Sequence, residues 1–374
     1  MFYSTLARTR RIAHLGSSDA AGTAPRSAEV AGVPPLTLSL SRLELPLVHT
    51  FTIARGSESV AKTLVFRLRW GELEGLGEAS PTPRYEETID SIERFFATFR
   101  FPSDDPYRLE TILAEIPVAA RCGLDLALHD LIGRDLGRPL WRLFGLDPQA
   151  APTTSFTIGI DTIERMVEKV LEVRTHPILK IKLGVGREIE TIEAIRSIYR
   201  GTIRIDANEG WSPESSVRIL TELERFEIEC CEQPIPAGSP ERLRWIRERV
   251  GIPIVADEDV RGAEDLPRLI GCVDGVNVKL IKCGGMRAAL AMIHTARALG
   301  LKVMLGCMVE SAILATAAAH LSPLADWADI DGPFLTADDP FSGLQYDPNG
   351  RLRLPDRPGL GVVESAPSRS TVRS

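Results

Sequence analysis

Three apolar runs in the second half of the chain each end in an acid: Ile203-Arg204-Ile205-Asp206, Ile228-Glu229-Cys230-Cys231-Glu232 and Ile252-Pro253-Ile254-Val255-Ala256-Asp257. The acids are 26 and 25 residues apart (206 to 232 and 232 to 257). One strand-plus-helix unit of a (β/α)8 barrel occupies roughly 30 residues, and all barrel strands end at one rim, so we expect the carboxylates to converge. Carboxylates are hard oxygen ligands, and a cluster of them is typical of a Mg²⁺ site. Helix N-caps are the alternative interpretation of these acids.

A pair of lysines comes before the three acids, in the segment Lys180-Ile181-Lys182. Residues i and i+2 share a face of a strand, so both amines point the same way. Inside a barrel the two amines repel each other and lose water. Both effects are expected to lower a lysine pKa towards neutrality and to make a usable base. A solvated edge strand is the alternative for this pattern taken alone, but the acids that follow favour the barrel interior.

A third lysine, Lys279, ends the predicted sixth strand, Asn277-Val278-Lys279. Six strands into a ring of eight, it lies across the barrel from Lys182. A substrate held on the metal between these two residues would meet one amine on each face. Lys282 comes three residues later, beside two glycines, and is interpreted as a loop lysine in water.

Two further acids, Asp329 and Asp331, repeat the i, i+2 pattern at the predicted eighth strand. Two carboxylates on one face of that strand are candidates to grip an ammonium group. A turn is the alternative, because Asp331-Gly332-Pro333 contains strong turn formers.

The composition of the 374-residue chain is that of an ordinary globular protein, 44% hydrophobic and 25% charged. Its net charge of -7 argues against a nucleic-acid partner. No apolar run approaches the roughly 20 residues that span a bilayer, so we expect no membrane partner. The six cysteines form no Cys-X-X-Cys pair and the six histidines no zinc-type pair. We therefore expect no disulfide framework and a cytoplasmic location.

The texture of the sequence divides the chain into five parts. Residues 1–35 lack periodicity and are predicted to be a disordered extension, and residues 365–374 a disordered tail. Residues 36–150 show strands followed by helices, which indicates an α+β domain. Residues 151–335 alternate strands and helices, which predicts a closed parallel barrel, with a doubly wound open sheet as the alternative. The predicted strands are 154–160, 178–183, 202–206, 228–232, 252–256, 275–279, 302–305 and 327–330.

Several motifs together resemble the enolase superfamily, and within it the dipeptide epimerases. The motifs are Lys180-Ile181-Lys182, Asp206-Ala207-Asn208-Glu209-Gly210-Trp211, Glu232-Gln233-Pro234, Ala256-Asp257-Glu258, Asn277-Val278-Lys279-Leu280, Asp329-Ile330-Asp331-Gly332-Pro333, Gly306-Cys307-Met308-Val309-Glu310-Ser311 and Pro83-Arg84-Tyr85-Glu86-Glu87-Thr88. The resemblance implies an α/β fold, a (β/α)7β modified TIM barrel with an N-terminal α+β capping domain over 36–150. It also implies that residues 336–364 return to that domain, and that the protein is a homo-oligomer.

The resemblance also implies a reaction. One Mg²⁺ on Asp206, Glu232 and Asp257 would hold the carboxylate of a small dipeptide. Lys182 or Lys279 would remove the α-proton, and the opposite lysine would return one to the other face. Lysine bases with Mg²⁺ at an ene-diolate are a known pattern of this superfamily.

Further residues are assigned to substrate binding by the same resemblance: Lys180, Asp329, Asp331, Thr157, Met308 and Arg55. Asp329 and Asp331 would bind the α-ammonium of the dipeptide. Arg55 lies in a polar loop, 52–59, that is similar to the loop covering the substrate in the Ala-Glu branch. Glu58 stands where that branch tends to carry a second basic residue, which leaves neutral or cationic side chains open.

Other members of the same superfamily are the alternatives: muconate cycloisomerase, o-succinylbenzoate synthase and N-acylamino acid racemase. They would reuse the lysines and the acids, but their substrates carry no free ammonium for Asp329 and Asp331 to bind. A Mg²⁺-binding protein without catalysis is the alternative from another class. Intact lysines argue against it.

Overall fold

The computed structural model describes residues 33–365. The predicted disorder of residues 1–35 and 365–374 falls almost entirely outside this range. The described chain begins with a three-stranded antiparallel sheet in the order β1 (Leu36–Ile53), β2 (Gly56–Trp70) and β3 (Leu73–Ala79). Four helices follow it: α1 (Ile89–Thr98), α2 (Leu109–Leu113), α3 (Val118–Asp135) and α4 (Leu140–Leu143).

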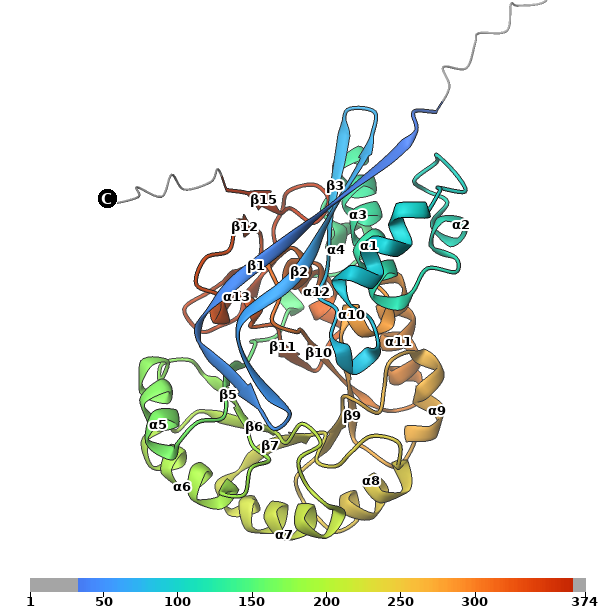
Figure 1. Ribbon diagram of the computed structural model, residues 1–374. Helices are drawn as coiled ribbons and strands as arrows, with labels where there is room; N and C mark the ends of the chain where they lie inside the picture. Colours follow the sequence, from blue (N-terminus) through green and yellow to red (C-terminus); the bar gives the residue numbers. More distant parts are fainter. Residues whose placement is uncertain (1–32, 366–374) are drawn as a thin grey trace, which may run out of the picture. The chain divides into compact units, whose positions relative to one another are not determined.

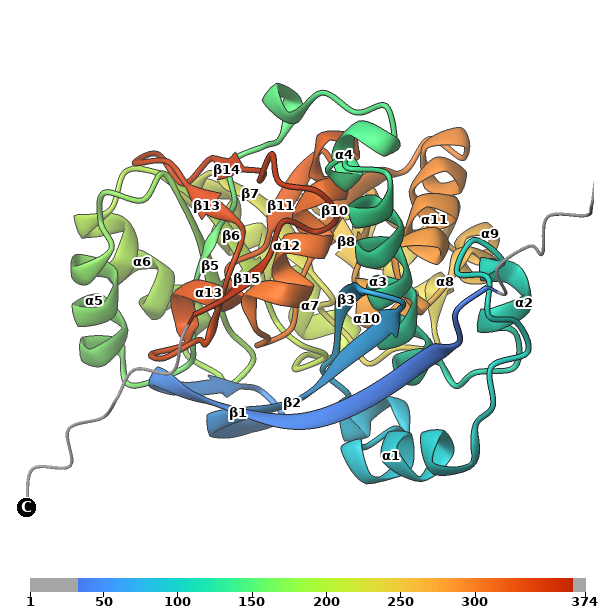
Figure 2. The same ribbon diagram turned by 90° about the horizontal axis from the view of Figure 1, so that it is seen from above.

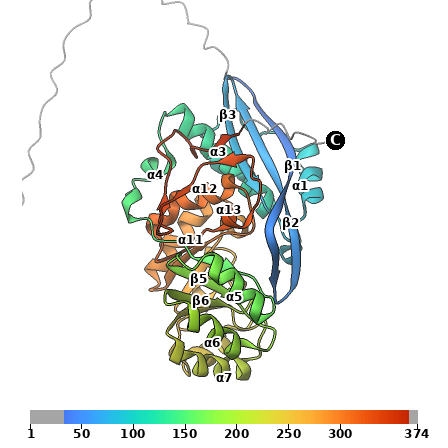
Figure 3. The same cartoon turned by 90° about the vertical axis from the view of Figure 1, so that its left-hand side faces the viewer.

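The β1–β2 hairpin is longer than the sequence predicts. The predicted polar loop 52–59 is mostly strand, and the turn itself is Ala54–Arg55. After a shift of register between Pro46 and Phe51, the strands pair again up to this turn, with Thr52 opposite Ser57 and their hydroxyl oxygens 2.9 Å apart. Figures 1 and 3 show that this hairpin reaches across to the ends of the barrel strands. The extension carries Arg55 over the barrel mouth.

Glycines allow α3 to lie directly on the sheet. A Cβ at Gly77 would lie 2.0 Å from the carbonyl oxygen of Gly123, and one at Gly123 would lie 2.3 Å from the ring of Phe66. No larger side chain fits at either contact without moving backbone or ring. Figure 2 shows α3 between this sheet and the barrel, which explains why almost every residue of this helix is buried.

Eight parallel strands form the second sheet, in which each strand pairs with the next one in the chain. The bounds are β4 (Phe156–Ile158), β5 (Ile178–Lys182), β6 (Thr202–Asp206), β7 (Ile228–Glu232), β8 (Ile254–Ala256), β9 (Gly275–Val278), β10 (Lys302–Gly306) and β11 (Trp327–Asp329). The first and last strands meet where the N–H of Ser155 donates to the carbonyl oxygen of Ala328 at 3.1 Å. The predicted closed barrel is therefore confirmed, and the open sheet is wrong.

Helices cover the outside of this barrel, as Figure 1 shows for α5 to α9. They are α5 (Ile163–Glu172), α6 (Glu188–Ile198), α7 (Pro213–Leu223), α8 (Pro240–Arg247), α9 (Leu266–Leu269), α11 (Met286–Ala298) and α12 (Ala312–Leu321). The one-turn helices α10 (Leu280–Cys283) and α13 (Gly332–Leu335) lie in the segments that follow β9 and β11. Leu179, Ile181, Ile203 and Ile205 point outwards into the large apolar core. The alternate residues point inwards, and Cys230, Val255, Met304 and Trp327 form a separate buried cluster in the barrel floor.

The last described residues contact the beginning of the chain. The N–H of Ala337 donates to the carbonyl oxygen of Pro46 at 2.8 Å, and Glu364 accepts from Arg67 at 2.8 Å. This part contains four two-residue strands: β12 (Phe341–Ser342), β13 (Gln345–Tyr346), β14 (Leu352–Arg353) and β15 (Val363–Glu364). The predicted domain limits at 150 and 335 stay a prediction.

A buried carboxylate of the first sheet holds the N-terminus of α12. Glu78 of β3 accepts from the N–H groups of Ser311 and Leu314, each at 3.0 Å, and from the Ser311 hydroxyl at 2.6 Å. The first N–H groups of a helix have no partner within the helix, so an acid at this place satisfies them.

Two acids of α3 make similar contacts with later segments. Asp125 accepts from the N–H of Met286, the first residue of α11, at 2.6 Å. Asp130 accepts from the N–H of Leu360 at 2.7 Å. Both acids are fully buried, so hydrogen bonds from later parts of the chain stabilise them.

All six cysteines are free. Among the helices of residues 33–365, none is long and apolar enough to cross a membrane.

Candidate active site

Three acids converge at the C-terminal ends of neighbouring barrel strands. Asp206 and Glu232 end β6 and β7 and lie opposite each other in the parallel ladder. Asp257 follows β8 directly. All three are at most 2% exposed. The predicted convergence is present, because the spacing of one strand and one helix returns each acid to the same rim.

The lysine pair of β5 lies against these acids. Lys180 Nζ is 2.6 Å from Glu232 Oε2 and 3.1 Å from Asp206 Oδ2. Lys182 Nζ donates to Asp206 Oδ2 at 2.7 Å. Both lysines are buried, as the shared strand face predicts, and the solvated edge strand is wrong.

Two lysines from the opposite side of the barrel hold Asp257. Lys279 Nζ donates to Asp257 Oδ2 at 3.0 Å. Lys282, which we expected in water, is buried and donates to the other carboxylate oxygen of Asp257. Its Nζ also contacts the carbonyl oxygens of Asp257 at 2.7 Å, Val260 at 3.1 Å and Asn277 at 3.1 Å. The expectation was wrong because α10 begins right after Lys279, and one helical turn brings Lys282 back beneath the acid.

For Lys180, the expected lowering of the lysine pKa is also wrong. Burial lowers the pKa of Lys180, but the charges of Asp329, Glu232 and Asp206 outweigh it and raise the pKa well above its ordinary value. Burial likewise lowers the pKa of Lys279, and Asp257 and Glu232 raise it by more. Carboxylates at contact distance therefore dominate over the repulsion between amines.

The donor chemistry of the acid cluster fits a hard divalent cation. Burial and the charge of Asp206 raise the pKa of Glu232, so these acids repel each other. Glu232 Oε2 is buried without a hydrogen bond, since Lys180 Nζ lies 2.6 Å away but outside hydrogen-bonding geometry. Within residues 33–365, no three Asp, Glu, His or Cys side chains already form a metal-binding group. The lysine amines occupy the space between the carboxylates. Oxygen donors with this excess of charge suit Mg²⁺.

Asp329 and Asp331 lie beside this cluster in different surroundings. Asp329 is 2.6 Å from Lys180 Nζ and accepts from the Ser155 hydroxyl at 2.5 Å. Asp331 accepts from the N–H of Thr157 at 2.7 Å and has no ion pair with any cation of the described chain. Burial and the charge of Asp329 raise the pKa of Asp331 to about 6. Asp331 is thus the acid of the pair that lacks a cation.

Arg55 of the hairpin turn is held by acids of the barrel. Its guanidinium is 2.7 Å from Glu258 and 2.9 Å from Glu209, and it donates to the carbonyl oxygen of Asn208 at 2.9 Å. Arg84 also pairs with Glu209, at 2.9 Å. The predicted role of Arg55 in binding an acidic substrate stays a prediction, but its charge is already matched here. The contacts fasten the hairpin over the barrel mouth.

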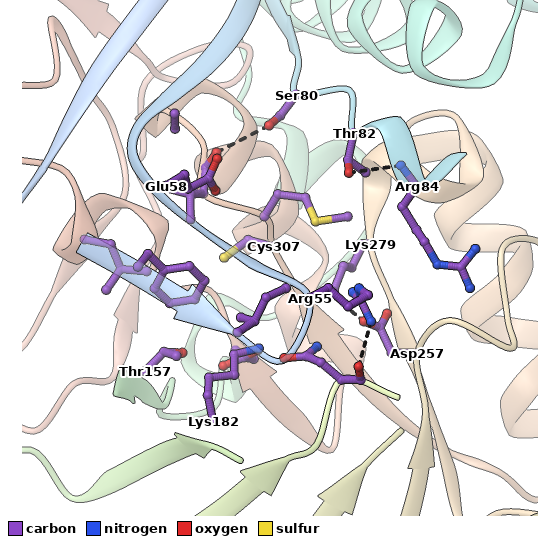
Figure 4. A pocket seen from close by; sticks show the side chains of 18 of the residues that line it. Arg55, Glu58, Ser80, Thr82, Arg84, Thr157, Lys182, Asp257, Lys279 and Cys307 are labelled. Carbon is purple, nitrogen blue, oxygen red and sulfur yellow. Dashed lines mark hydrogen bonds and ion pairs between the residues drawn. The ribbon is translucent and has the colours of Figure 1, made fainter. Parts of the chain in front are cut away.

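A cavity of about 230 Å³ brings the predicted residues together (Figure 4). Its lining includes Lys180, Lys182, Asp257, Lys279, Asp329, Asp331, Thr157, Met308 and Arg55. Asp206 and Glu232 do not line it and are covered by Lys180 and Lys182. Figure 4 shows Lys182 and Lys279 entering from different sides.

Sequence reasoning missed two aromatic residues of this cavity. Phe51 lines it, and its ring centre lies 5.9 Å from Lys182 Nζ. Tyr85 also lines it, and burial and the charge of Asp257 raise its pKa. Phe51 could have been placed here only if β1 and β2 were expected to pair beyond residue 52. The polar residues 52–59 predict a loop instead. For Tyr85 we see no signal beyond the motif that contains it.

Comparison with known families matches both parts of the chain. Residues 40–145 match the family described as mandelate racemase / muconate lactonizing enzyme, N-terminal domain. Residues 162–365 match the family described as enolase C-terminal domain-like. The second match alone covers 204 of the 374 residues (162 to 365), which is more than half of the chain.

Individual relatives extend over nearly the same range. The chain is 37% identical over 330 residues to an L-Ala-D/L-Glu epimerase of Bacteroides thetaiotaomicron, with 86% of each chain covered. It is 36% identical over 335 residues to an L-Ala-D/L-amino acid epimerase of a Maribacter species, covering 88% of this chain and 99% of the relative. A solved structure with a TM-score of 0.83 and 29% identity covers 90% of this chain and 97% of its own. It is the dipeptide epimerase from Cytophaga hutchinsonii, complexed with Mg and the dipeptide D-Ala-L-Val.

Proposed function

This chain belongs to the enolase superfamily, and from that premise we propose that it is a Mg²⁺-dependent dipeptide epimerase. The reaction inverts the α-carbon of the C-terminal residue of an L,L-dipeptide and gives the L,D-dipeptide. It requires one group that removes a proton from one face of that carbon and another that returns a proton to the opposite face.

The arrangement of Lys182 and Lys279 carries the proposal. Lys182 ends β5 and Lys279 follows β9, and these strands are four places apart in a ring of eight. The two amines therefore reach the cavity from opposite walls. An α-carbon between them has one amine on each face, so either lysine is placed to act as base or acid. Asp257 and Glu232, whose charges raise the pKa of Lys279, would be shared with a bound cation.

Asp206, Glu232 and Asp257 would hold Mg²⁺. When bound, the ion supplies positive charge that offsets the negative charge appearing on the substrate carboxylate as the α-proton leaves. Lys180, at 2.6 Å from Glu232 and from Asp329, joins the metal acids to the second acid pair. Lys180 positions the metal acids and the Asp329–Asp331 pair beside the substrate, and the bases are the other two lysines.

The substrate class follows from Asp331. A free α-ammonium would supply the cation that this buried carboxylate lacks, and Asp329 lies beside it. Thr157 fixes the carboxylate through its backbone N–H. Met308 lies on the same cavity wall. Cycloisomerases and N-acylamino acid racemases act on substrates without a free ammonium, so they leave this acid unexplained.

The three relatives support the same class, since all are epimerases of dipeptides or of L-Ala-amino acid pairs. We further infer a cytoplasmic location, for which the six free cysteines are the support. A homo-oligomer is inferred from the family alone. The capping domain over 36–150, the barrel over 151–335 and the returning segment over 336–364 remain part of this proposal.

The test is incubation of the protein with Mg²⁺ and L,L-dipeptides in D2O, read by mass spectrometry and chiral chromatography. We expect deuterium at one α-carbon together with the L,D product, and no reaction after EDTA. Two single variants, Lys182→Ala and Lys279→Ala, show which lysine acts on which face of the α-carbon. We expect one to lose both exchange and inversion, and the other to exchange deuterium without inversion, each with inversion slowed at least about 100-fold.

Lys302→Ala is the matched control, because Lys302 is exposed at the start of β10 and does not line the cavity. It should behave as the wild type. Absence of deuterium from every dipeptide, in folded protein with Mg²⁺, would refute the epimerase proposal.

A further inference from the structure

The direction of the substrate side chain can be worked out from the site, and this step rests on the proposed function. Once the α-proton has left, the α-carbon and its three substituents lie in one plane. Because Lys182 and Lys279 act on the two faces, that plane is perpendicular to the line from β5 to β9. The carboxylate points towards the acids of β6, β7 and β8. The amide nitrogen, which leads to the N-terminal residue and its ammonium, points towards Asp329 and Asp331 at β11. The remaining direction in the plane is the barrel axis, so the side chain of the substrate points along this axis.

Only one end of that axis is open. The floor is closed by the packed cluster of Cys230, Val255, Met304 and Trp327. The other end is the barrel mouth, which the tip of the β1–β2 hairpin covers (Figures 1 and 4). The side chain of the epimerised residue therefore points at this hairpin, and the charges of the hairpin decide which side chains it accepts.

Most charges of the hairpin are already matched. Arg55 is paired with Glu258 and Glu209. Glu44 and Lys62 are opposite each other, 3.5 Å apart and both largely exposed. Lys62 borders the cavity, but its side chain is 65% exposed and its amine is paired with Glu44.

Glu58 is different, because its side chain borders the cavity and its carboxylate is not paired with any cation of the described chain. It is directly opposite Phe51 in the hairpin, and opposed residues share a face with Cβ atoms about 5 Å apart. The Phe51 ring lies 5.9 Å from Lys182 Nζ, so this face looks onto the reacting centre. The exposed side chain of Glu58 borders the cavity and forms no ion pair or hydrogen bond with any residue from 33 to 365. Figure 4 shows it on the side of the cavity away from Asp257.

We propose that Glu58 is a specificity residue that favours a cationic side chain at the epimerised position and disfavours an acidic one. A lysine or arginine side chain pointing out of the barrel brings its charge to a carboxylate that lacks a partner. An acidic side chain meets like charge there. It finds Arg55 already neutralised by Glu258 and Glu209, so it must compete with two fixed acids for that guanidinium.

The test compares three dipeptides that differ only at the second residue: L-Ala-L-Lys, L-Ala-L-Met and L-Ala-L-Glu. Exchange of the α-proton in D2O gives kcat/KM, and titration calorimetry with Mg²⁺ gives Kd. In Glu58→Gln we expect the Lys-to-Met ratio to fall about 5-fold, the upper range for a partly exposed ion pair. The Lys-to-Glu ratio should fall about 10-fold, because attraction and repulsion are both lost. Glu58→Lys should reverse that preference.

Glu72→Gln is the matched control, since it removes the same charge from an exposed turn between β2 and β3 that does not line the cavity, and it should leave all ratios unchanged. Lys-to-Glu ratios that stay within 2-fold of wild type in both Glu58 variants, while exchange continues, overturn the role of Glu58 and leave the epimerase in place. A preference for L-Ala-L-Lys in Kd that Glu58→Gln removes, with no exchange of any dipeptide, keeps the role of Glu58 and overturns the epimerase.

Discussion

Replacing Lys282 by methionine should destabilise the protein, although sequence reasoning places this residue in solvent. Its Nζ is enclosed by the carboxylate of Asp257 and by three carbonyl oxygens, and its side chain is 1% exposed. Lys282→Met keeps the length of the side chain and removes the charge and the donors. Asp257 then retains only Lys279 as an ion-pair partner among the described residues.

The size of the effect follows from burial. Removing one partner of a buried ion pair costs about 3–5 kcal/mol, because the remaining charge loses its partner and cannot recover water. Unfolding entropy near the melting temperature is about 2.1 cal/mol/K per residue, so the 333 described residues (33 to 365) give about 0.7 kcal/mol/K. The expected loss of Tm is therefore roughly 4–7 °C.

Differential scanning calorimetry in EDTA measures this loss without reference to any activity. Lys62→Met is the control, since its exposed pair with Glu44 is worth about 1 kcal/mol at most. A Tm for Lys282→Met within 1 °C of that control would refute the reasoning, because it would mean that the amine contributes nothing to the buried cluster.

Two further predictions concern Asp331 and His320. Asp331→Asn keeps an oxygen for the Thr157 N–H and removes the charge, so KM for free dipeptides should rise about 10-fold or more while Tm changes little; an unchanged KM would count against ammonium binding. His320 is buried with Nδ1 accepting from the N–H of Trp141 and Nε2 facing the carbonyl oxygen of Leu360, and burial lowers its pKa to about 4. The folded state thus binds this proton less readily than the unfolded one, so stability is complete above about pH 6.5 and falls by about 2 kcal/mol at pH 5. Urea titrations should show a shallower pH slope in His320→Gln, and equal slopes would contradict the assignment.

The barrel and most of its acid and lysine side chains could be predicted because strand parity and spacing are local properties. Lys180 and Lys182 share a face by alternation alone. The interval between Asp206, Glu232 and Asp257 needs only the length of one strand and one helix. These features do not depend on which side chains come to lie between them.

The remaining features depend on contacts that local patterns do not contain. The pKa directions of Lys180 and Lys279 follow from carboxylates on other strands. Lys282 is buried because a single helical turn after Lys279 folds back beneath Asp257. The partners of Arg55 lie more than 150 residues away in the chain. The polar residues at the hairpin tip predict a loop, because the local pattern does not contain the barrel acids that Arg55 contacts.

The buried carboxylates Glu78, Asp125 and Asp130 have a consequence for exchanging modules between relatives. Each comes from the first 150 residues and accepts N–H groups from a later segment, at Ser311, Met286 and Leu360 respectively. Leaving such a buried acid or its donors unmatched costs about 1–3 kcal/mol for each group. A chimaera that joins the first part of this chain to the barrel of another member must therefore transplant both sides of every such bond. Whether the N–H donors of the second part match these three acids of the first part will therefore decide which chimaeras fold.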